Sequence, residues 1–209
     1  MGYQACVQAS DAPVPQGSVG AGTGATVGKI LGMEYATKGG LGSASMIVGD
    51  VVIGALVVVN PFGDVRDPRN GQIIAGPRVT SAQSKATSDA AVFRDTLALM
   101  KRNAGVSSQL LSNTVVGVVA TNARLTKEEA NKVAQMAQDG LARTIFPAHT
   151  MFDGDTIFAL STGSQACDVS TVGACAAEVV ADAVVRAVYE AKKLAEIPAY
   201  RDIVSATGV

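Results

Sequence analysis

The stretch Met46–Asn60 reads MIVGDVVIGALVVVN, and its part from Ile53 to Val59 is almost continuously apolar and rich in Val. Such a run is typical of a β-strand that is covered on both faces. It is too short to span a bilayer, which needs roughly 20 apolar residues. We therefore predict a buried central strand here, which ends at Pro61-Phe62-Gly63-Asp64.

Two further segments have the composition of buried strands, namely Thr114–Thr121 (TVVGVVAT) and Thr156–Ser161 (TIFALS). Thr126-Lys127-Glu128-Glu129 matches a capping box, which predicts a helix from about Lys127 to Arg143. A second amphipathic helix is predicted over about Val172–Leu194. Interior strands with helices outside favour a layered α/β or α+β sandwich.

Three other segments carry weaker signals. The Gly-rich stretch from Asp11 to Gly28 has no apolar period and is predicted to be a loop. Asp64–Pro77 is rich in Asp, Arg, Asn, Gly and Pro, and we expect an exposed excursion there. Ser88–Arg102 shows a weak helical pattern.

The composition is that of a single soluble, globular domain. Hydrophobic residues make up 48% of the 209 residues, which argues against disorder. Lys and Arg number 17 against 18 Asp and Glu, so the net charge of −1 argues against a strongly basic nucleic-acid-binding domain. Three Cys and one His indicate neither a disulfide framework nor a zinc site. No secretory signal pattern opens the chain, so we expect a cytoplasmic protein without membrane attachment.

Gly22–Lys29 (GTGATVGK) invites comparison with a phosphate-binding loop. Such a loop needs Gly five residues before the Gly-Lys pair and Ser or Thr after the Lys, but Thr23 and Ile30 occupy these positions. The dinucleotide-type pattern at Gly20–Ala25 follows no strand. From the residues alone, Lys29 is a solvated side chain at the end of a loop that lets backbone segments approach closely.

Thr114 follows Asn113 where a polar segment meets a Val-rich strand. A Thr at such a junction is an ordinary β-branched strand residue or a nucleophile that cleavage of the preceding bond releases. A Thr hydroxyl is a weak nucleophile, but an α-amine on the same residue can activate it as a base.

Four blocks occur in the order found in one known family: Pro15–Ala25, Val57–Asp64, Asn113–Ala123 and Asp153–Thr156. Together they resemble the self-processing P1 peptidase family, which includes L-aminopeptidase/D-amidase/esterases, β-peptidyl aminopeptidases and nylon-oligomer (6-aminohexanoate oligomer) hydrolases. The resemblance covers about Pro15–Leu194. It implies a four-layer αββα sandwich of the N-terminal-nucleophile type and an amidohydrolase that needs no cofactor or metal.

The resemblance also implies self-cleavage between Asn113 and Thr114. One domain, residues 1–209, would then consist of the end of an α subunit (1–113) and a β subunit (114–209) that stay together. Relatives carry a long segment before the Gly-rich block, whereas this chain has only Met1–Val14, so it looks N-terminally truncated. A periplasmic location stays open if that segment carries a signal.

By the same resemblance, the catalytic residues are Thr114, Lys29, Asn60, Asp153 and Asp155. Thr114 would be the nucleophile in both cleavage and catalysis, with Lys29 and Asn60 stabilising negative charge. The two Asp residues would orient the hydroxyl and the Lys or recognise a substrate amine; an ordinary Asp-Gly-Asp turn is the alternative. His149 could form a triad with Thr114, although an N-terminal nucleophile does not need an imidazole.

The expected partners are a peptide or small amide substrate and further copies of the chain in a homo-oligomer, with no nucleic acid. Two other functions stay open. One is an acyl transferase of the ornithine acetyltransferase type, and the other is an inactive, truncated relative that only binds or assembles.

Overall fold

A four-stranded sheet forms the centre of the fold in the computed structural model, which describes residues 2–79, 92–102 and 113–207. Its strands lie in the order β3 (Gly40–Val48), β4 (Val51–Val59), β7 (Val116–Ala123) and β9 (Thr156–Gln165). The β3–β4 and β4–β7 pairs are antiparallel, whereas β7 and β9 are parallel. All three predicted strand segments therefore lie in one sheet.

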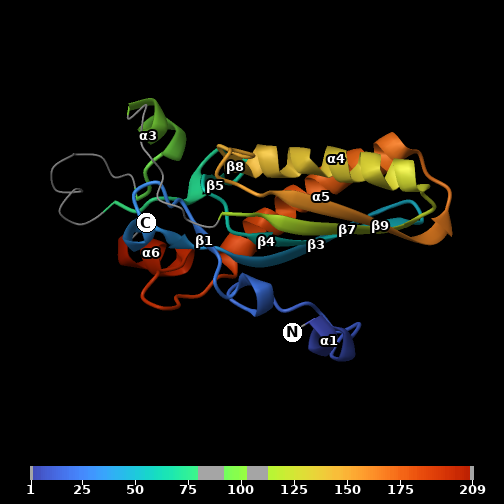
Figure 1. Cartoon of the computed structure of the whole chain (residues 1–209), viewed down its shortest axis with the longest axis horizontal. Helices are drawn as coiled ribbons and strands as arrows, with labels where there is room; N and C mark the ends of the chain where they lie inside the picture. Colours follow the sequence, from blue (N-terminus) through green and yellow to red (C-terminus); the bar gives the residue numbers. More distant parts are fainter. Residues whose placement is uncertain (1, 80–91, 103–112, 208–209) are drawn as a thin grey trace.

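Two long helices, α4 (Lys127–Thr144) and α5 (Val169–Tyr189), cover the same face of this sheet (Figure 1). Thr126 caps α4 in the predicted capping box with Glu129. The second helix begins earlier than predicted, because the Asp168 side chain accepts the N–H of Thr171 and caps it there, and it ends earlier, at Tyr189. The α/β class and the packing of both helices on one face are thus confirmed.

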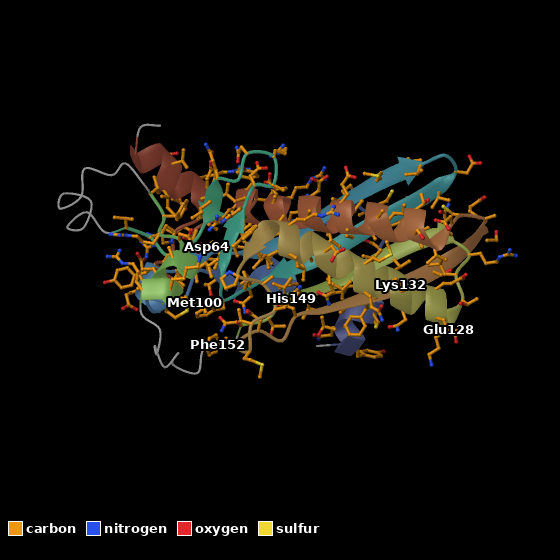
Figure 2. The ribbon with its side chains drawn as sticks, turned by 90° about the horizontal axis from the view of Figure 1, so that it is seen from above. Asp64, Met100, Glu128, Lys132, His149 and Phe152 are labelled. Carbon is orange, nitrogen blue, oxygen red and sulfur yellow. The ribbon has the colours of Figure 1, made fainter. Side chains whose placement is uncertain are left out.

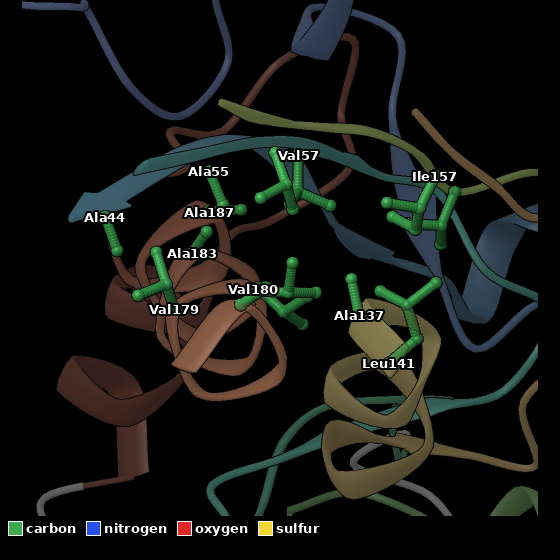
Figure 3. Close-up of a cluster of buried hydrophobic side chains, with 14 of the residues drawn as sticks. Ala44, Ala55, Val57, Ala137, Leu141, Ile157, Val179, Val180, Ala183 and Ala187 are labelled. Atoms are coloured by element: carbon green, nitrogen blue, oxygen red, sulfur yellow. The ribbon is translucent and has the colours of Figure 1, made fainter. Parts of the chain in front are cut away.

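The core lies between the sheet and these helices (Figure 3). Strand residues such as Val57 and Ile157 contribute to it together with Leu141 of α4 and Val180 of α5. Many contributors on α5 are Ala or Val, and small side chains let the helix approach the sheet closely. A Cβ at Gly42, for example, would lie 1.9 Å from the Ala183 carbonyl oxygen, so only Gly fits there.

The opposite face of the sheet is open within the described part of the chain. Along β4, buried residues alternate with more exposed ones, and Val52 and Leu56 are exposed. Phe158 and Leu160 of β9 are exposed as well. The expectation of a strand covered on both faces is therefore wrong within the described residues. The main sheet and the two helices form one sheet layer and one helix layer of the expected sandwich.

The apolar stretch Met46–Asn60 is also not a single strand. Gly49, with a positive φ of 58°, and Asp50 form a tight turn between β3 and β4. The register pairs Val48 with Val51 directly across this turn. Glycine adopts positive φ without strain, so the one Gly-Asp pair in this stretch marks a hairpin.

Smaller elements flank the main sheet at one end. They include a three-stranded sheet, β6 (Ile73–Ala75), β5 (Asp64–Arg66) and β8 (Ile145–Phe146), and a β1 (Thr26–Val27)–β2 (Thr37–Lys38) pair. The remaining elements are α1 (Gly2–Val7), η1 (Gly20–Gly22), η2 (Met33–Tyr35), α3 (Thr96–Arg102) and α6 (Tyr200–Thr207). The helical prediction for Ser88–Arg102 is met only over Thr96–Arg102 (α3), because residues 92–95 are not helical and positions 88–91 lie outside the described residues.

Asp64–Pro77 is the predicted exposed excursion only over residues 68–72, and its two ends are largely buried. Asp64 is fully buried, and its carboxylate accepts hydrogen bonds from the backbone N–H and hydroxyl of Thr96. Burial raises the pKa of Asp64 to about 7. The segment thus ties α3 to the small sheet.

No helix in the described ranges is long and apolar enough to cross a membrane.

Candidate active site

The strand register brings three distant segments together at one end of the main sheet. Val58, near the end of β4, pairs with Val116 at the start of β7. Val116 in turn pairs with Thr156 at the start of β9. The residues just after β4 and just before β7 and β9 therefore lie side by side, and these are Asn60, Asn113-Thr114 and Asp153-Gly154-Asp155.

Thr114 is partly buried, and both the N–H and the C=O of the peptide bond that precedes it form hydrogen bonds. Its N–H donates to the carbonyl oxygen of Asn60 at 3.0 Å. Its hydroxyl donates to the carbonyl oxygen of Asn113. The same Asn113 oxygen accepts the N–H of Gly154 at 3.1 Å. The hydroxyl of Thr114 thus lies against the carbonyl group of its own preceding peptide, and a backbone donor polarises that group.

Lys29 is buried, with 3% of its surface exposed, and is not the solvated loop-end residue that the Gly-rich pattern alone suggests. Its Nζ donates to the carbonyl oxygens of Thr26 (2.8 Å), Asn60 (3.2 Å) and Pro61 (3.1 Å) and to Asn60 Oδ1 (2.9 Å). Asn60 therefore joins Lys29 to Thr114, because its carbonyl oxygen accepts from both residues. The N–H of Thr26 also donates to Asn60 Oδ1, at 3.0 Å, and fixes the orientation of the amide.

Burial lowers the pKa of Lys29 to about 7 from its ordinary value of 10.5. The negative charge of Asp153 opposes this effect, and the positive charge of Lys38 adds to it. The physical cause is the loss of water around the ammonium group, which the surrounding oxygens replace only in part.

Lys29, Asn60 and Thr114 line one cavity of about 400 Å³. Its other lining residues are small or apolar: Ala21, Gly24, Ala25, Thr26, Met33, Val58 and Val116. Lys29 is the charged residue among those that line it. The cavity thus presents a hydroxyl, an amide and a cation against an otherwise apolar wall.

The carboxylates of Asp153 and Asp155 accept hydrogen bonds from backbone N–H groups near this cavity. Asp153 Oδ1 accepts the N–H of Phe62 at 2.9 Å, and its Oδ2 accepts the hydroxyl of Thr150 at 2.6 Å. Asp155 Oδ1 accepts the N–H of Val115, the residue after Thr114, at 2.9 Å. Both carboxylates therefore position neighbouring backbone, and neither lines the cavity.

Gly154, between the two acids, lies so close to Thr114 that a side chain at this position would crowd the Thr114 hydroxyl. A Cβ at this position would lie 3.0 Å from Thr114 Oγ1. The absence of a side chain leaves room for the hydroxyl, while the Gly154 N–H binds the Asn113 carbonyl oxygen.

His149 does not complete a triad with Thr114. Its ring Nδ1 instead lies 3.0 Å from Asp155 Oδ2. No group of three or more His, Cys, Asp or Glu within the described ranges is arranged to hold a metal ion.

The structure therefore brings all five predicted site residues to one end of the sheet, with Lys29, Asn60 and Thr114 in the cavity and the two acids beside it. It adds three residues that the sequence reasoning did not select, namely Thr26, Thr150 and Gly154. Thr150 carried a usable signal, because a Thr three residues before an Asp often forms a local side-chain contact.

The comparisons with known proteins identify the family. The family model for Peptidase family S58 matches residues 1–199. The chain belongs to peptidase family S58. Among S58 relatives, an uncharacterized aminopeptidase of Mycobacterium leprae is 39% identical over 219 residues, which cover 95% of this chain and 55% of the relative. A 6-aminohexanoate-oligomer endohydrolase of Kocuria sp. is 34% identical over 186 residues, which cover 83% and 50%.

Solved structures show the same fold. The L-aminopeptidase D-Ala-esterase/amidase of Ochrobactrum anthropi, described as a variant of the Ntn hydrolase fold, matches 99% of this chain and 56% of its own. Its TM-score is 0.61 at 22% identity. The PH0078 protein of Pyrococcus horikoshii gives 0.63 at 23%, over 99% and 54%. This S58 chain thus spans little more than half the length of these proteins.

Proposed function

We propose that this S58 chain is an N-terminal-nucleophile amidohydrolase that cleaves itself before Thr114 and then uses Thr114 to hydrolyse amide bonds. One observation carries the proposal. The Thr114 hydroxyl contacts the carbonyl group of the Asn113–Thr114 peptide, and the Gly154 N–H donates to that same carbonyl oxygen. A nucleophile and an oxyanion donor on one carbonyl are what acyl transfer requires.

In the self-cleavage step, Thr114 Oγ forms a bond to the carbonyl carbon of Asn113. The carbon–nitrogen bond then breaks, the nitrogen takes up the proton that the hydroxyl gives up, and an ester joins the Asn113 carboxyl to Thr114 Oγ. Water hydrolyses this ester, which releases the Asn113 carboxylate and leaves Thr114 with a free amine and a free hydroxyl. The N–H of Gly154 would stabilise the negative charge that develops on the Asn113 oxygen.

In the mature enzyme, the α-amine of Thr114 would accept the hydroxyl proton while Oγ attacks the carbonyl carbon of a bound amide. The acyl group passes to Thr114, the amine product leaves with a proton, and water hydrolyses the acyl ester. Lys29 fixes Asn60, and Asn60 holds the nitrogen of Thr114. This chain of contacts supports a role for Lys29 in keeping the nucleophile aligned.

The names of the relatives and the cavity suggest the substrates. Relatives are named as aminopeptidases and as 6-aminohexanoate-oligomer endohydrolases. The cavity is lined mainly by small or apolar residues. We propose that peptides or short amide oligomers with small or unbranched acyl parts bind there.

Hydrolysis assays test this function. The purified chain, Thr114→Ala and Thr114→Ser are incubated with amino-acid p-nitroanilides and with 6-aminohexanoate oligomers. We expect turnover by the wild type, reduced turnover by Thr114→Ser because the hydroxyl is kept, and none by Thr114→Ala. Undiminished hydrolysis by Thr114→Ala would contradict the proposal, as would transfer of an acetyl group from N-acetylornithine to glutamate as the principal reaction.

A further inference from the structure

The His149 imidazole is the solvent-facing partner of a buried carboxylate. The Asp155 side chain is 2% exposed, whereas that of His149 is 40% exposed. Asp155 Oδ2 lies 3.0 Å from His149 Nδ1 and accepts the His149 N–H at 3.3 Å. The other oxygen, Oδ1, accepts the N–H of Val115 at 2.9 Å. One carboxylate therefore connects His149 to the residue that follows Thr114.

The backbone of His149 supports a specific role for this contact. Its φ of 53° lies in the left-handed region, which residues other than Gly adopt rarely and which His, Asn and Asp tolerate better than most. In this conformation its N–H and its ring nitrogen both reach Asp155 Oδ2. Unfavourable backbone conformations of this kind concentrate at functional sites. Figure 2 shows His149 beyond the end of α4 that is distant from Glu128 and Lys132.

We propose that His149 is a positioning residue for self-cleavage, which keeps Asp155 oriented on the Val115 N–H and thereby fixes the Thr114 hydroxyl against the Asn113 carbonyl. This inference rests on the proposed function. The imidazole does not contact Thr114 in any hydrogen bond that the structure shows, so it acts through Asp155. Asp155 is the carboxylate that it faces directly, while Asp153 is engaged by Phe62 and Thr150 and acts on Lys29.

Two substitutions distinguish a role of His149 in positioning Asp155 from a general loss of stability. His149→Gly removes the ring and tolerates the left-handed backbone, and His149→Asn keeps an uncharged donor near Nδ1. Met151→Ala, at a neighbouring position that is 99% exposed, serves as the control. The rate of appearance of the fragment that begins at Thr114 is followed by mass spectrometry, with thermal unfolding measured on the same samples.

We expect His149→Gly to cleave about tenfold more slowly than the wild type, as for a modest misplacement of a reacting group. His149→Asn should cleave at nearly the wild-type rate, because it keeps a donor near the position of Nδ1. Met151→Ala should match the wild type throughout.

An unchanged rate in His149→Gly would overturn the inference, as would a His149→Asn variant that cleaves as slowly as His149→Gly. Either result, with a wild type that still cleaves before Thr114, leaves the proposed function standing. A wild type that does not cleave refutes the proposed function itself, and the inference with it.

Discussion

Lys29 and Asp155 are both almost completely buried beside Thr114, but they are held in opposite ways. The Lys29 ammonium gathers four oxygens from segments that are more than thirty residues apart in the sequence, at Thr26 and at Asn60-Pro61. Asp155 instead accepts backbone N–H groups, from Val115, which is 40 residues away in the sequence, and from His149 in its own turn region.

The difference shows that the positive charge of Lys29 and the negative charge of Asp155 have different structural roles around Thr114. The cation joins the Gly-rich loop to the end of β4, so its loss should disturb the whole cavity. The acidic turn fixes the peptide groups next to Thr114, so its loss should act locally. The predictions below test this contrast.

Lys29→Met should have the largest effect, because it leaves oxygens of Thr26, Asn60 and Pro61 without their donor. We expect self-cleavage to slow about 1000-fold, near the upper range for loss of one charge-stabilising group. Lys38→Met is the matched control, since Lys38 is also buried but donates to the Thr23 carbonyl oxygen and not to Asn60. Time courses of fragment formation check the prediction, and equal losses in both variants would refute a special role for Lys29.

Gly154→Ala should cause the second-largest decrease in the rate of self-cleavage, although it removes no charge. The new Cβ would lie 3.0 Å from Thr114 Oγ1, so the hydroxyl must move by a few tenths of an ångström. We expect self-cleavage to slow about 30-fold, less than the roughly 100-fold that a displacement of 1 Å can cost. Gly54→Ala in β4 is the control, because a Cβ there has 3.9 Å to its nearest neighbour. A Gly154→Ala variant that cleaves as fast as Gly54→Ala would contradict the local action of the turn.

The buried cation should also give stability a characteristic dependence on pH. The pKa of Lys29 is about 7 in the folded protein against 10.5 ordinarily, so between these values the unfolded chain binds more protons. The free energy of unfolding should therefore rise with pH, by about 3–4 kcal/mol from pH 7 to 10, because each unit of pKa difference is worth about 1.4 kcal/mol. Urea unfolding at several pH values measures this, and Lys29→Met should remove the rise. A rise that persists in Lys29→Met would assign it to another group.

Substitutions of Asp153 and Asp155 should have smaller effects, and the two variants should differ in the property that changes. Asp155→Asn should slow self-cleavage about tenfold by weakening the hold on Val115, and should leave the pH dependence of stability unchanged. Asp153→Asn should move that dependence to lower pH, because the charge of Asp153 raises the pKa of Lys29. Parallel cleavage and unfolding measurements on both variants distinguish the two acids; identical pH curves would show that Asp153 is not coupled to Lys29.

Much of the fold could be predicted from local sequence. The Val-rich strands β4 and β7 and the capping box before α4 are governed by residues within each segment. The hairpin at Gly49-Asp50 was not predicted, because the residues around it are apolar and only Gly49, which adopts a positive φ, indicates the turn. The open face of β4 could not be predicted, because the residue types of a strand do not reveal whether a second layer covers it.

The site was predictable only where a motif existed. Thr114, Asn60 and Lys29 were selected by resemblance, whereas the burial of Lys29 depends on the distant segment at Asn60-Pro61. The role of Gly154 depends on the parallel pairing of β9 with β7, which no local pattern encodes. Asp64 was missed for the same reason, since its partner Thr96 lies 32 residues away.

The central claim is that Thr114 cuts the bond that precedes it. Intact-mass measurement with N-terminal sequencing of the purified wild type and Thr114→Ala tests it most directly. The account predicts that the wild type yields one fragment that begins at Thr114 and a complement that ends at Asn113, while Thr114→Ala stays whole. A wild type that remains a single chain, or a Thr114→Ala variant cut at the same bond, would contradict it.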